Sequence, residues 1–371
     1  MARSRAILVV LCACGSSSHK AIDAPNPDAA VTPSKLVAYV SGYGPDLGVY
    51  EVAPTGGLSS ASTTTAFAAS PSFLAIAPGG STLYAVSEAS NGRVAAYSID
   101  AATGGLAYLD DVSSGGAGPA HVSVDRSGSH VLVANYDDGT ISVLPIVAGG
   151  RLGTASQTLA AGANAHMILT DPSNRYVFVP CLGSDYVAQY LFDETSGALA
   201  PNAVPHVATA ANAGPRHLAF APDGKHAYLI NERASTMTAL ELDAATGRLT
   251  ELQTLSTRPA GATGANTTAE VWVHPSGKFL YGSNRGDDTI VQFAIDATGR
   301  LSLVGHTPTQ GQTPRDFTLD PAGTFLYVAN QGSNSVVPFA IDATTGTLSP
   351  TASPITAQVP TFIGLVALPQ S

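Results

Sequence analysis

The sequence predicts an all-β fold: a seven-bladed β-propeller with four-stranded blades, closed by the C-terminal strand completing the N-terminal blade. Three observations lead to this prediction: two short phrases alternate along the chain, the two differ in number, and β-type runs lie between them. Self-similarity at a period of about 40 to 50 residues is typical of repeat architectures. We therefore interpret the chain as one structural unit repeated many times.

The first phrase ends in Gly-x-Leu and marks one hairpin in each repeat. Its seven copies are APTGGL (53–58), DAATGGL (100–106), VAGGRL (147–152), DETSGAL (193–199), DAATGRL (243–249), DATGRL (296–301) and DATTGTL (342–348). The regular spacing of the copies predicts seven repeats.

The second phrase lies between copies of the first and predicts a tight turn. Its six copies are APGG (77–80), DRSG (125–128), DPSN (171–174), APDG (221–224), HPSG (274–277) and DPAG (320–323). Asp at the first position, Pro at the second and Gly at the fourth are typical of type I turns, because Pro presets φ and the Asp side chain bonds the turn amides.

Short apolar runs flank each turn, for example HLAF (217–220) and HAYLIN (226–231). Apolar residues occupy both alternating positions of these runs, which is typical of strands that are covered on both faces. No helical pattern of useful length competes with them. Each repeat is therefore predicted to be a small antiparallel sheet.

The unequal counts of the two phrases predict how the ring closes. The first repeat starts with LVAYVSGYG (36–44), which matches the strand after a turn, and the final segment TFIGLVAL (361–368) matches the missing strand before it. Residues 36–371 provide 48 residues per repeat, enough for four strands. A ring closed in this way leaves no open edge, whereas an open stack needs caps.

The composition agrees with a large all-β domain and excludes some partners. The 371 residues include 37 Gly and 25 Pro, which fits many turns because 44% of the chain is apolar. The formal net charge of −10 argues against nucleic acid or an anionic lipid surface as a partner. We expect a monomer.

The first 35 residues predict export. Arg3 and Arg5 precede the apolar run 6–13, which is too short to span a bilayer and ends at small residues. Residues 11–14 (Leu-Cys-Ala-Cys) resemble a bacterial lipobox, so residues 1–13 are predicted to be a lipoprotein-type signal peptide and Cys14 the lipid attachment site. Residues 14–35 then form a flexible tether to the propeller at 36–371, in the bacterial cell envelope. The alternative is an ordinary soluble export signal.

If Cys14 carries lipid, the mature chain keeps one further cysteine, Cys181, in the apolar run YVFVPC. A disulfide framework is then impossible, and packing must hold the fold. We expect Cys181 to be buried and inert.

Aligning the repeats on the second phrase brings polar residues to one rim of the ring. Eight residues after the last turn residue lie Glu88, Tyr136, Leu182, Glu232, Arg285 and Gln331, with Asn directly before four of them. Five residues before the turn lie Ser72, Ala120, His166, Arg216, Ala269 and Arg315. One step further along lie His121, His217, Glu270 and Asp316. Since equivalent strand ends in a propeller converge on the axis, these side chains are predicted to meet; the alternative is a merely solvated rim.

The residue types at this rim predict acid–base chemistry on an anion. His166 can transfer a proton near neutral pH, and Glu232 can do so if its surroundings shift it. Arg216, Arg285 and Arg315 carry planar donors suited to a carboxylate, a phosphate or an oxyanion. His121 and His217 could contact substrate, although each could instead bond backbone groups within its own blade.

Five motifs resemble the lactonase family of seven-bladed propellers: AGPRHLAF (213–220), INE (230–232), SNRGDDTI (283–290), PRDF (314–317) and VANQ (328–331). That family contains the propeller-type bacterial 6-phosphogluconolactonases and the fungal enzyme that lactonises carboxymuconate. The resemblance implies a catalytic set of His166, Arg216, Glu232 and Arg285. It also implies a substrate contact for Arg315. His121, His217 and Gln331, at the same rim, are further candidates for substrate contacts. This chain departs from the family at Asn164, where many members have a second histidine, and at Arg233, where they have Leu.

We therefore expect hydrolysis, or formation, of a lactone of a small acidic sugar- or muconate-type substrate, with no cofactor and no metal. An envelope protein would not meet 6-phosphogluconolactone, a cytoplasmic intermediate, so the resemblance does not fix the substrate. The alternative is a catalytically silent surface-anchored propeller that binds a protein or glycan and exposes a large apolar patch. A redox propeller is disfavoured because no haem-attachment motif is present. Calcium or magnesium in the channel is disfavoured by the nearby arginines.

Overall fold

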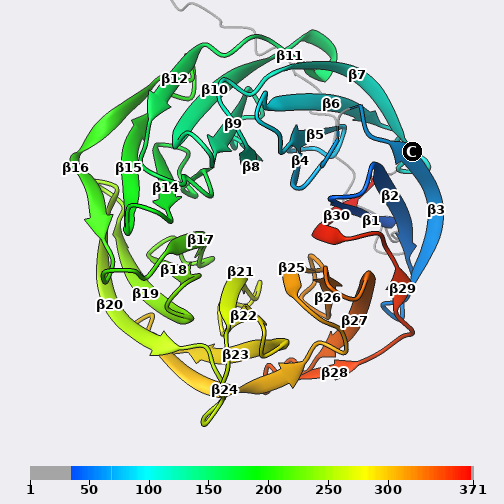
Figure 1. Ribbon diagram of the computed structural model, residues 1–371, viewed down its shortest axis with the longest axis vertical. Helices are drawn as coiled ribbons and strands as arrows, with labels where there is room; N and C mark the ends of the chain where they lie inside the picture. The colour runs from blue at the N-terminus through cyan, green and yellow to red at the C-terminus, as the bar shows by residue number, and fades with distance from the viewer. Residues whose placement is uncertain (1–34, 68, 369–371) are drawn as a thin grey trace, which may run out of the picture. The chain divides into compact units, whose positions relative to one another are not determined.

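The computed structural model describes residues 35–67 and 69–368, which form a ring of seven antiparallel sheets around a central axis (Figure 1). This confirms the predicted seven-bladed propeller. Its one helix within the described residues is the short 3-10 turn η1 (Ala148–Gly150). None of the described helices is long and apolar enough to cross a membrane. The predicted signal peptide, Cys14 and most of the predicted tether lie outside the described residues.

Each blade extends from an innermost strand at the axis to an outermost strand at the periphery. In that order, blade I contains β30 (Pro360–Ala367), β1 (Leu36–Gly42), β2 (Asp46–Val52) and β3 (Leu58–Thr65). Blade II contains β4 (Leu74–Ile76), β5 (Thr82–Ser87), β6 (Arg93–Ile99) and β7 (Leu106–Ser113). Blade III contains β8 (Pro119–Val124), β9 (His130–Asn135), β10 (Thr140–Val147), β11 (Arg151–Leu152) and β12 (Gln157–Ala160). Blade IV contains β13 (Leu169–Thr170), β14 (Tyr176–Cys181), β15 (Tyr186–Phe192) and β16 (Leu199–Ala208).

The remaining blades follow the same order. Blade V contains β17 (Pro215–Phe220), β18 (His226–Asn231), β19 (Thr236–Asp243) and β20 (Arg248–Ser256). Blade VI contains β21 (Thr267–Val273), β22 (Phe279–Arg285), β23 (Thr289–Ile295) and β24 (Leu301–Pro308). Blade VII contains β25 (Pro314–Leu319), β26 (Phe325–Asn330), β27 (Ser335–Ile341), β28 (Leu348–Pro350) and β29 (Ile355–Thr356). In blades III and VII the outermost strand is divided into two short pieces, both paired with the third strand.

The predicted closure is confirmed, because the last strand of the chain is the innermost strand of the first blade. β30 pairs antiparallel with β1 from Leu36 opposite Ala367 to Ser41 opposite Phe362. The pairing hides the edges of both strands, which would otherwise offer unpaired backbone groups to another chain.

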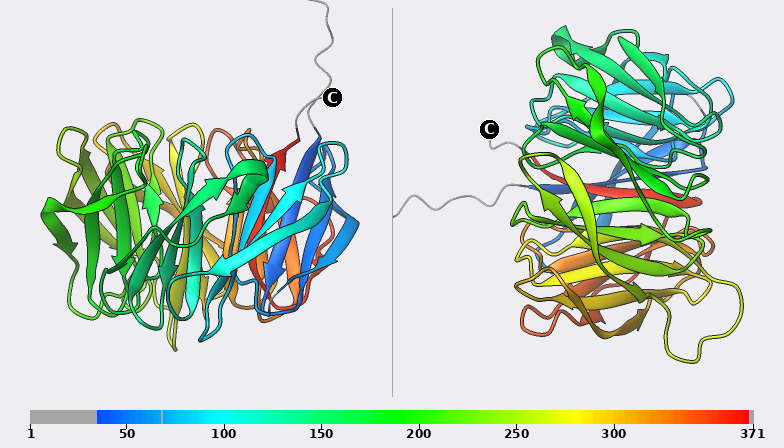
Figure 2. Two further views of the ribbon diagram at one scale, coloured as in Figure 1. Left: turned by 90° about the horizontal axis from the view of Figure 1, so that it is seen from above. Right: turned by 90° about the vertical axis from the view of Figure 1, so that its left-hand side faces the viewer.

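The second phrase forms the predicted turns and defines one face of the ring, which we call the turn face. In all six copies the N–H of the fourth residue donates to the carbonyl of the first, as in Gly128 to Asp125 at 3.0 Å. The fourth residue has positive φ in every copy, and Asn174 adopts it in the copy that lacks Gly. Because successive strands alternate in direction across the ring (Figure 2), the loops into each first strand and out of each second strand lie on the opposite face, which we call the site face.

The core lies between neighbouring blades, and tyrosines of the second strands fasten one blade to the next. Tyr39, Tyr84, Tyr228 and Tyr281 are buried, and each hydroxyl donates to a glycine carbonyl in the Gly-x-Leu hairpin of the following blade. A buried hydroxyl needs such a partner, since an unpaired one costs free energy. The Gly-x-Leu phrase therefore forms the hairpin of its own blade and also accepts a hydrogen bond from the preceding blade.

We expect Tyr281→Phe to lower the free energy of unfolding by about 1 to 2 kcal/mol, because the Gly346 carbonyl loses the hydroxyl that now lies 3.0 Å away. Tyr327 provides the matched control, since its equally buried hydroxyl has no partner among the described residues. Tyr327→Phe should therefore be neutral or stabilising. Urea unfolding followed by circular dichroism measures both changes, and equal losses in the two variants would contradict this role of the tyrosine contact.

Cys181 is a free cysteine with no exposed surface in β14, as the sequence predicts. Burial raises the pKa of its thiol to about 12. The thiolate, which is the reactive form, is therefore absent at neutral pH.

Candidate active site

Bulges at the site-face ends of the innermost strands bring pairs of polar residues to the axis. The register between first and second strands shifts between Pro215 and His217, and again between Pro314 and Asp316. A bulge sets two consecutive residues opposite one on the neighbouring strand and so redirects a side chain. Both Arg216 and His217 consequently contact groups from other blades.

The predicted asparagines anchor the ends of the second strands. Asn135, Asn231, Asn284 and Asn330 are buried. The first three donate their side-chain amides to the threonine hydroxyl at the start of the next strand, and Asn330 donates to the Thr309 carbonyl in the loop before β25. In six blades the residue after the second strand then donates its N–H to the loop that enters the first strand, as Glu232 does to the Gly214 carbonyl at 2.7 Å. This holds the following side chain at the channel mouth.

The accepting loop residues have positive φ in six blades: Ser70, Gly118, Asn164, Gly214, Thr313 and Val359. The β-branched Val359 is the most unusual of these, with φ of 43°. Such conformations cost free energy and are concentrated at functional sites. Asn164, the departure from the family motif, belongs to this set and donates its amide to the Tyr136 carbonyl.

Glu232 bridges two arginines at the mouth. Its Oε2 lies 3.0 Å from Nε of Arg216 and 2.9 Å from a terminal nitrogen of Arg285. Arg216 also donates to the carbonyl of Ala269 at 2.6 Å, and Arg285 donates to the carbonyl of Thr268 at 2.8 Å. The predicted meeting of Arg216, Glu232 and Arg285 is thus seen directly in the geometry.

The two guanidinium groups are held in place before any ligand arrives. Arg216 is 3% exposed, and burial, together with the charge of Arg285, lowers its pKa to about 10, so that it stays charged at neutral pH. Burial likewise lowers the pKa of Arg285. The Nε groups of both arginines are buried without a well-aligned acceptor, although that of Arg216 lies close to Glu232. Fixed donors of this kind can stabilise negative charge that develops on a substrate.

His166 lies beside this cluster and is 6% exposed. Its ring centroid is 5.1 Å from that of His217 and 5.5 Å from that of Tyr136, and its Nδ1 has no partner among the described residues. Burial lowers the pKa of His166 well below the usual value, and Arg216, His217, Arg315 and Arg285 lower it further. The imidazole is therefore neutral at physiological pH and able to accept a proton.

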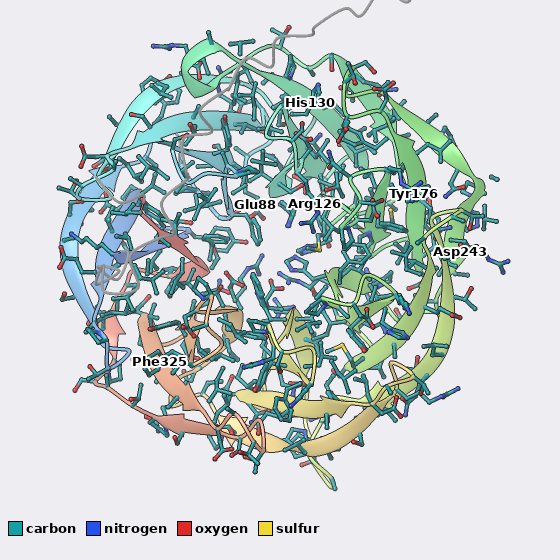
Figure 3. All side chains as sticks on the ribbon, turned by 180° about the vertical axis from the view of Figure 1, so that it is seen from behind. Glu88, Arg126, His130, Tyr176, Asp243 and Phe325 are labelled. Atoms are coloured by element: carbon teal, nitrogen blue, oxygen red, sulfur yellow. The ribbon has the colours of Figure 1, made fainter. Side chains whose placement is uncertain are left out.

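Arg315 lies at the other side of the mouth. Its guanidinium carbon is 5.3 Å from the ring centroid of Tyr43, whose hydroxyl donates to Glu88 Oε1 at 3.2 Å. Figure 3 shows Glu88 pointing toward the axis of the ring, whereas His130, Tyr176, Asp243 and Phe325 lie farther out in the blades. Among the described residues, no hydrogen bond or ion pair joins Glu232 to Arg315 or to His166. Three of the five predicted charged or imidazole groups are therefore bonded together, and two flank them.

Tyr43 is a site residue that the sequence alignment missed. It directly follows β1, in the position that Glu88 has after β5, and completes the ring of residues after the second strands. The alignment started from the turn phrase, which blade I lacks because its first two strands come from opposite ends of the chain. Alignment on the tyrosine four residues earlier, Tyr39 or Tyr84, would have found it.

His121 and His217 lie one layer deeper than the residues at the mouth, and the suggestion that they bond backbone within their own blades is wrong. His217 Nδ1 is 2.7 Å from Glu270 Oε2 in the next blade, and His121 Nδ1 accepts the N–H of Ile168, also in the next blade. The aromatic rings of His121, His217 and Phe73 contact one another across the channel. Gln331 stands on the rim, where its N–H donates to the Thr313 carbonyl.

Glu270 and Asp316 complete this deeper layer, a pairing that the sequence did not reveal. Both are buried, and their carboxyl groups lie close enough together for each to change the pKa of the other. Burial raises the pKa of Glu270 to about 7, and burial together with the charge of Glu270 raises that of Asp316 well above its usual value. The pair therefore keeps a proton to higher pH than two isolated carboxyl groups would.

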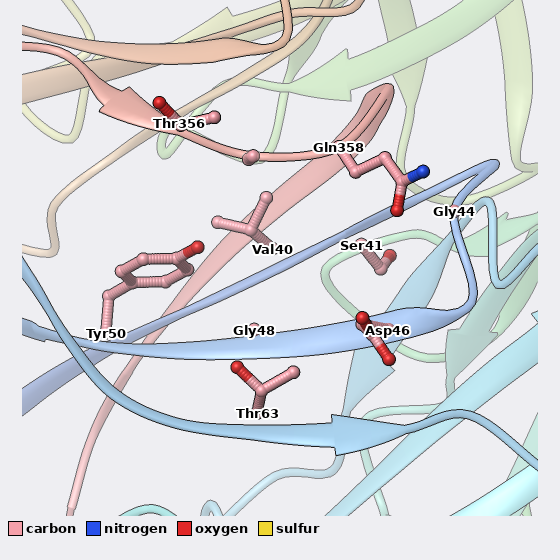
Figure 4. A pocket seen from close by; sticks show the side chains of 10 residues that line it. Val40, Ser41, Gly44, Asp46, Gly48, Tyr50, Thr63, Thr356 and Gln358 are labelled. Carbon is pink, nitrogen blue, oxygen red and sulfur yellow. The ribbon is translucent and has the colours of Figure 1, made fainter.

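Other candidate sites receive less support from the described residues. No group of three or more His, Cys, Asp and Glu side chains in them is arranged to hold a metal ion. The alternative of a silent binding propeller predicts one large apolar patch, but the exposed large apolar residues in the described part are spread over several blades: Tyr43, Phe67, Tyr108, Val147, Leu191, Trp272, Leu303 and Val304. A crevice of about 130 Å³ beside the closure, between Tyr50, Asp46 and Gln358, contains none of the predicted residues (Figure 4).

Comparison with known proteins agrees with the geometry. Residues 37–365 match the sequence model of the family described as lactonase, 7-bladed beta-propeller. The 6-phosphogluconolactonase of Pectobacterium carotovorum is 35% identical over 277 residues, covering 74% of this chain and 82% of the relative. That of Bacillus subtilis is 33% identical over 265 residues, covering 67% and 73%.

Solved structures give the same result. The periplasmic gluconolactonase of Pseudomonas aeruginosa superposes with a TM-score of 0.84 at 30% identity, covering 91% of this chain and 100% of that one. A putative 6-phosphogluconolactonase from Bacteroides fragilis has a TM-score of 0.84 at 29% identity, covering 91% and 100%. Because the family match spans nearly the whole propeller, this chain belongs to the seven-bladed β-propeller lactonases.

Proposed function

We propose that the protein hydrolyses the lactone of a small acidic sugar at the mouth formed by His166, Arg216, Glu232 and Arg285. The observation that carries this proposal is the Glu232 bridge between two buried guanidinium groups beside a neutral imidazole. Such a site offers a proton acceptor and fixed positive charge together, which are the two requirements for adding water to an ester carbonyl.

The reaction follows from these roles. His166 removes a proton from water, whose oxygen attacks the lactone carbonyl carbon. The carbonyl oxygen becomes an oxyanion that accepts hydrogen bonds from Arg216 and Arg285. The tetrahedral carbon then expels the ring oxygen, which takes the proton back from His166, so the product is the open hydroxy acid. Glu232 keeps the two guanidinium groups oriented throughout.

The surroundings of the site support a substrate that carries an acid group. Arg315 has no carboxylate partner among the described residues and lies at the open side of the mouth, against Tyr43. Its planar donors match a carboxylate or phosphate. The carboxyl of Glu88 and the Tyr43 hydroxyl next to it can hydrogen-bond sugar hydroxyls.

We also propose that the protein works outside the cytoplasm, attached through lipid at Cys14, and contacts the membrane only through that anchor. The charged start and apolar run of residues 1–13 support export. The similarity to a periplasmic gluconolactonase supports the same location. A sugar lactone without phosphate is then the substrate to test first.

A panel of lactones tests the proposal. We expect the purified protein to accelerate hydrolysis of at least one aldonolactone, measured by pH-stat against the spontaneous rate. The panel should include glucono-δ-lactone, its 6-phosphate and a muconolactone. A folded protein that accelerates none of them would contradict the proposal.

We expect Arg315→Gln to raise KM for an acid-bearing lactone by about tenfold and to leave kcat within about twofold of the wild-type value. The reason is that a charge contact far from the reacting bond stabilises the bound substrate and the transition state equally, so its loss weakens binding alone. A neutral lactone serves as the control, since its KM should not change. Steady-state kinetics on both substrates measure this difference. Equal effects on the two lactones would contradict a role for Arg315 in anion binding.

A further inference from the structure

The channel has a second chamber on the turn face, separated from the catalytic mouth by the deeper layer. This turn-face cavity has a volume of about 620 Å³. Its opening is formed by turn residues such as Arg126, Pro275 and Asp320. Figure 3, which views the ring from behind, shows Arg126 near the axis. The volume lies within the range of about 300 to 1,000 Å³ that is typical of small-molecule sites.

The wall of the cavity is apolar. Ile76, Val124, Leu169, Phe220 and Leu365 line it and are only partly buried. Trp272, which is 41% exposed, lies on the same wall. A concave apolar surface open to water is unfavourable unless something covers it, and it is typical of ligand sites. The wall therefore selects a ligand with an apolar body.

The floor of the cavity is acidic. Glu270 and Asp316 both line it, and their carboxyl groups lie close enough together for each to change the pKa of the other. Glu270 also accepts from His217 and from the N–H of Val271, while Asp316 accepts the N–H groups of Phe317 and Ile363. With Asp320 at the opening, three of the four charged-type residues that line the cavity are acids. Arg126, the fourth, donates its Nε–H to the Asp171 carbonyl.

We propose that the turn-face cavity is a second binding site, distinct from the catalytic mouth, for a small apolar molecule that ends in a protonated primary amine. The ammonium would take the place of the proton that the two carboxyl groups share. Its three N–H donors suit a pair of carboxylates, and its charge offsets theirs in a region poor in water. A carboxylate ligand would be repelled, and an alcohol could not replace the proton.

Positively charged groups above the floor weaken the attraction of the two carboxyl groups for an ammonium group but do not turn it into repulsion. Arg216 faces Glu270 from the mouth, where it shares the negative charge of Glu232, 3.0 Å away, with Arg285. His121 and His217 are neutral, because burial lowers the pKa of both well below the usual value. Apart from Arg126 at the opening, no residue that lines the cavity supplies a permanent positive charge to the two carboxyl groups.

Trp272 makes the proposal directly measurable, because it is the only tryptophan in the chain. We expect 4-phenylbutylamine to change its fluorescence with saturation in the full-length protein. The matched 4-phenylbutan-1-ol should bind at least about tenfold more weakly and 4-phenylbutyrate not at all. The affinity for the amine should rise severalfold from about pH 6 to about pH 8. Over this range the carboxyl pair loses the proton that competes with the ammonium group, while the amine itself stays protonated. Equal binding of the three probes, or no amine binding, would overturn the proposal.

Variants locate the site. Glu270→Gln should remove the preference for amine over alcohol, with the fold checked by its melting curve. Val124→Arg places a positive charge and bulk on the cavity wall and should weaken amine binding by about tenfold or more. Val304→Arg, the same change at an exposed outer position, is the control and should leave binding unchanged. Two results would refute the site. One is an unchanged preference for amine over alcohol in a folded Glu270→Gln variant, and the other is an equal loss of amine binding in Val124→Arg and Val304→Arg.

Discussion

Replacing Arg216 by Lys is expected to lower kcat/KM for lactone hydrolysis by about 10² to 10³-fold, the effect of removing one donor to an oxyanion. Lysine keeps the positive charge but lacks the planar fork. Arg216 uses separate nitrogens to reach the Ala269 carbonyl and Glu232. One ammonium cannot hold both partners and still present a donor to the substrate.

The lysine variant is preferred to alanine because Arg216 is almost fully buried. Removing its charge would leave Glu232 facing only Arg285, and breaking a buried ion pair costs about 3 to 5 kcal/mol of stability. Arg258→Lys provides the control, since Arg258 makes a comparable forked contact with Asp287. If Arg216→Lys and Arg258→Lys lower kcat/KM to the same extent, the loss does not come from a missing donor at the mouth, and the role of Arg216 is contradicted.

Replacing His166 by Asn is expected to lower kcat by about 10² to 10⁴-fold, the usual contribution of a general base. The wild-type pH profile should carry a second signature. Because the pKa of His166 is lowered well below the usual histidine value, its imidazole remains neutral as the pH falls through about 6.5. The value of kcat/KM should therefore stay level from about pH 8 to below about pH 6.5.

The matched residue for this experiment is His206, an imidazole in β16 on the outer strand of blade IV. His206→Asn should leave both kcat and the pH profile unchanged. A wild-type profile that falls with a midpoint near the ordinary histidine pKa, or an active His166→Asn enzyme, would contradict the role of His166 as the base.

The overall fold could be predicted from the sequence because its repeats mark turns that depend on local chemistry. The fourth residue of each turn phrase needs positive φ, and Gly or Asn meets that need whatever surrounds it. The closure also followed from counting, since the last segment of the chain had to supply the strand that the first blade lacked. These features involve a few neighbouring residues each, so they are readable in one sequence.

The site was predicted in part. Equivalent positions in the repeats led to Arg216, Glu232 and Arg285, and the structure brings these into contact. The bulge at Pro215 could not be foreseen, because it depends on the register between two strands rather than on composition. In a regular strand the consecutive side chains of Arg216 and His217 would point to opposite faces, whereas here both contact blade VI.

The raised pKa values of Glu270 and Asp316 could not be predicted from the sequence for a different reason. The two carboxyl groups lie in blades VI and VII. Burial raises the pKa of both, and the charge of Glu270 raises that of Asp316 further. Burial in the channel is a property of the closed ring, so no single strand contains the signal. The turn-face cavity likewise requires side chains from most blades at once.

The central claim is that side chains from separate blades act as one catalytic unit, and a double-mutant cycle of His166→Asn and Arg216→Lys tests it most directly. Residues that act in one step show strongly non-additive losses. We predict that the double variant loses little more kcat/KM than the more damaged single variant. Losses that multiply, as expected for two independent sites, would contradict the account.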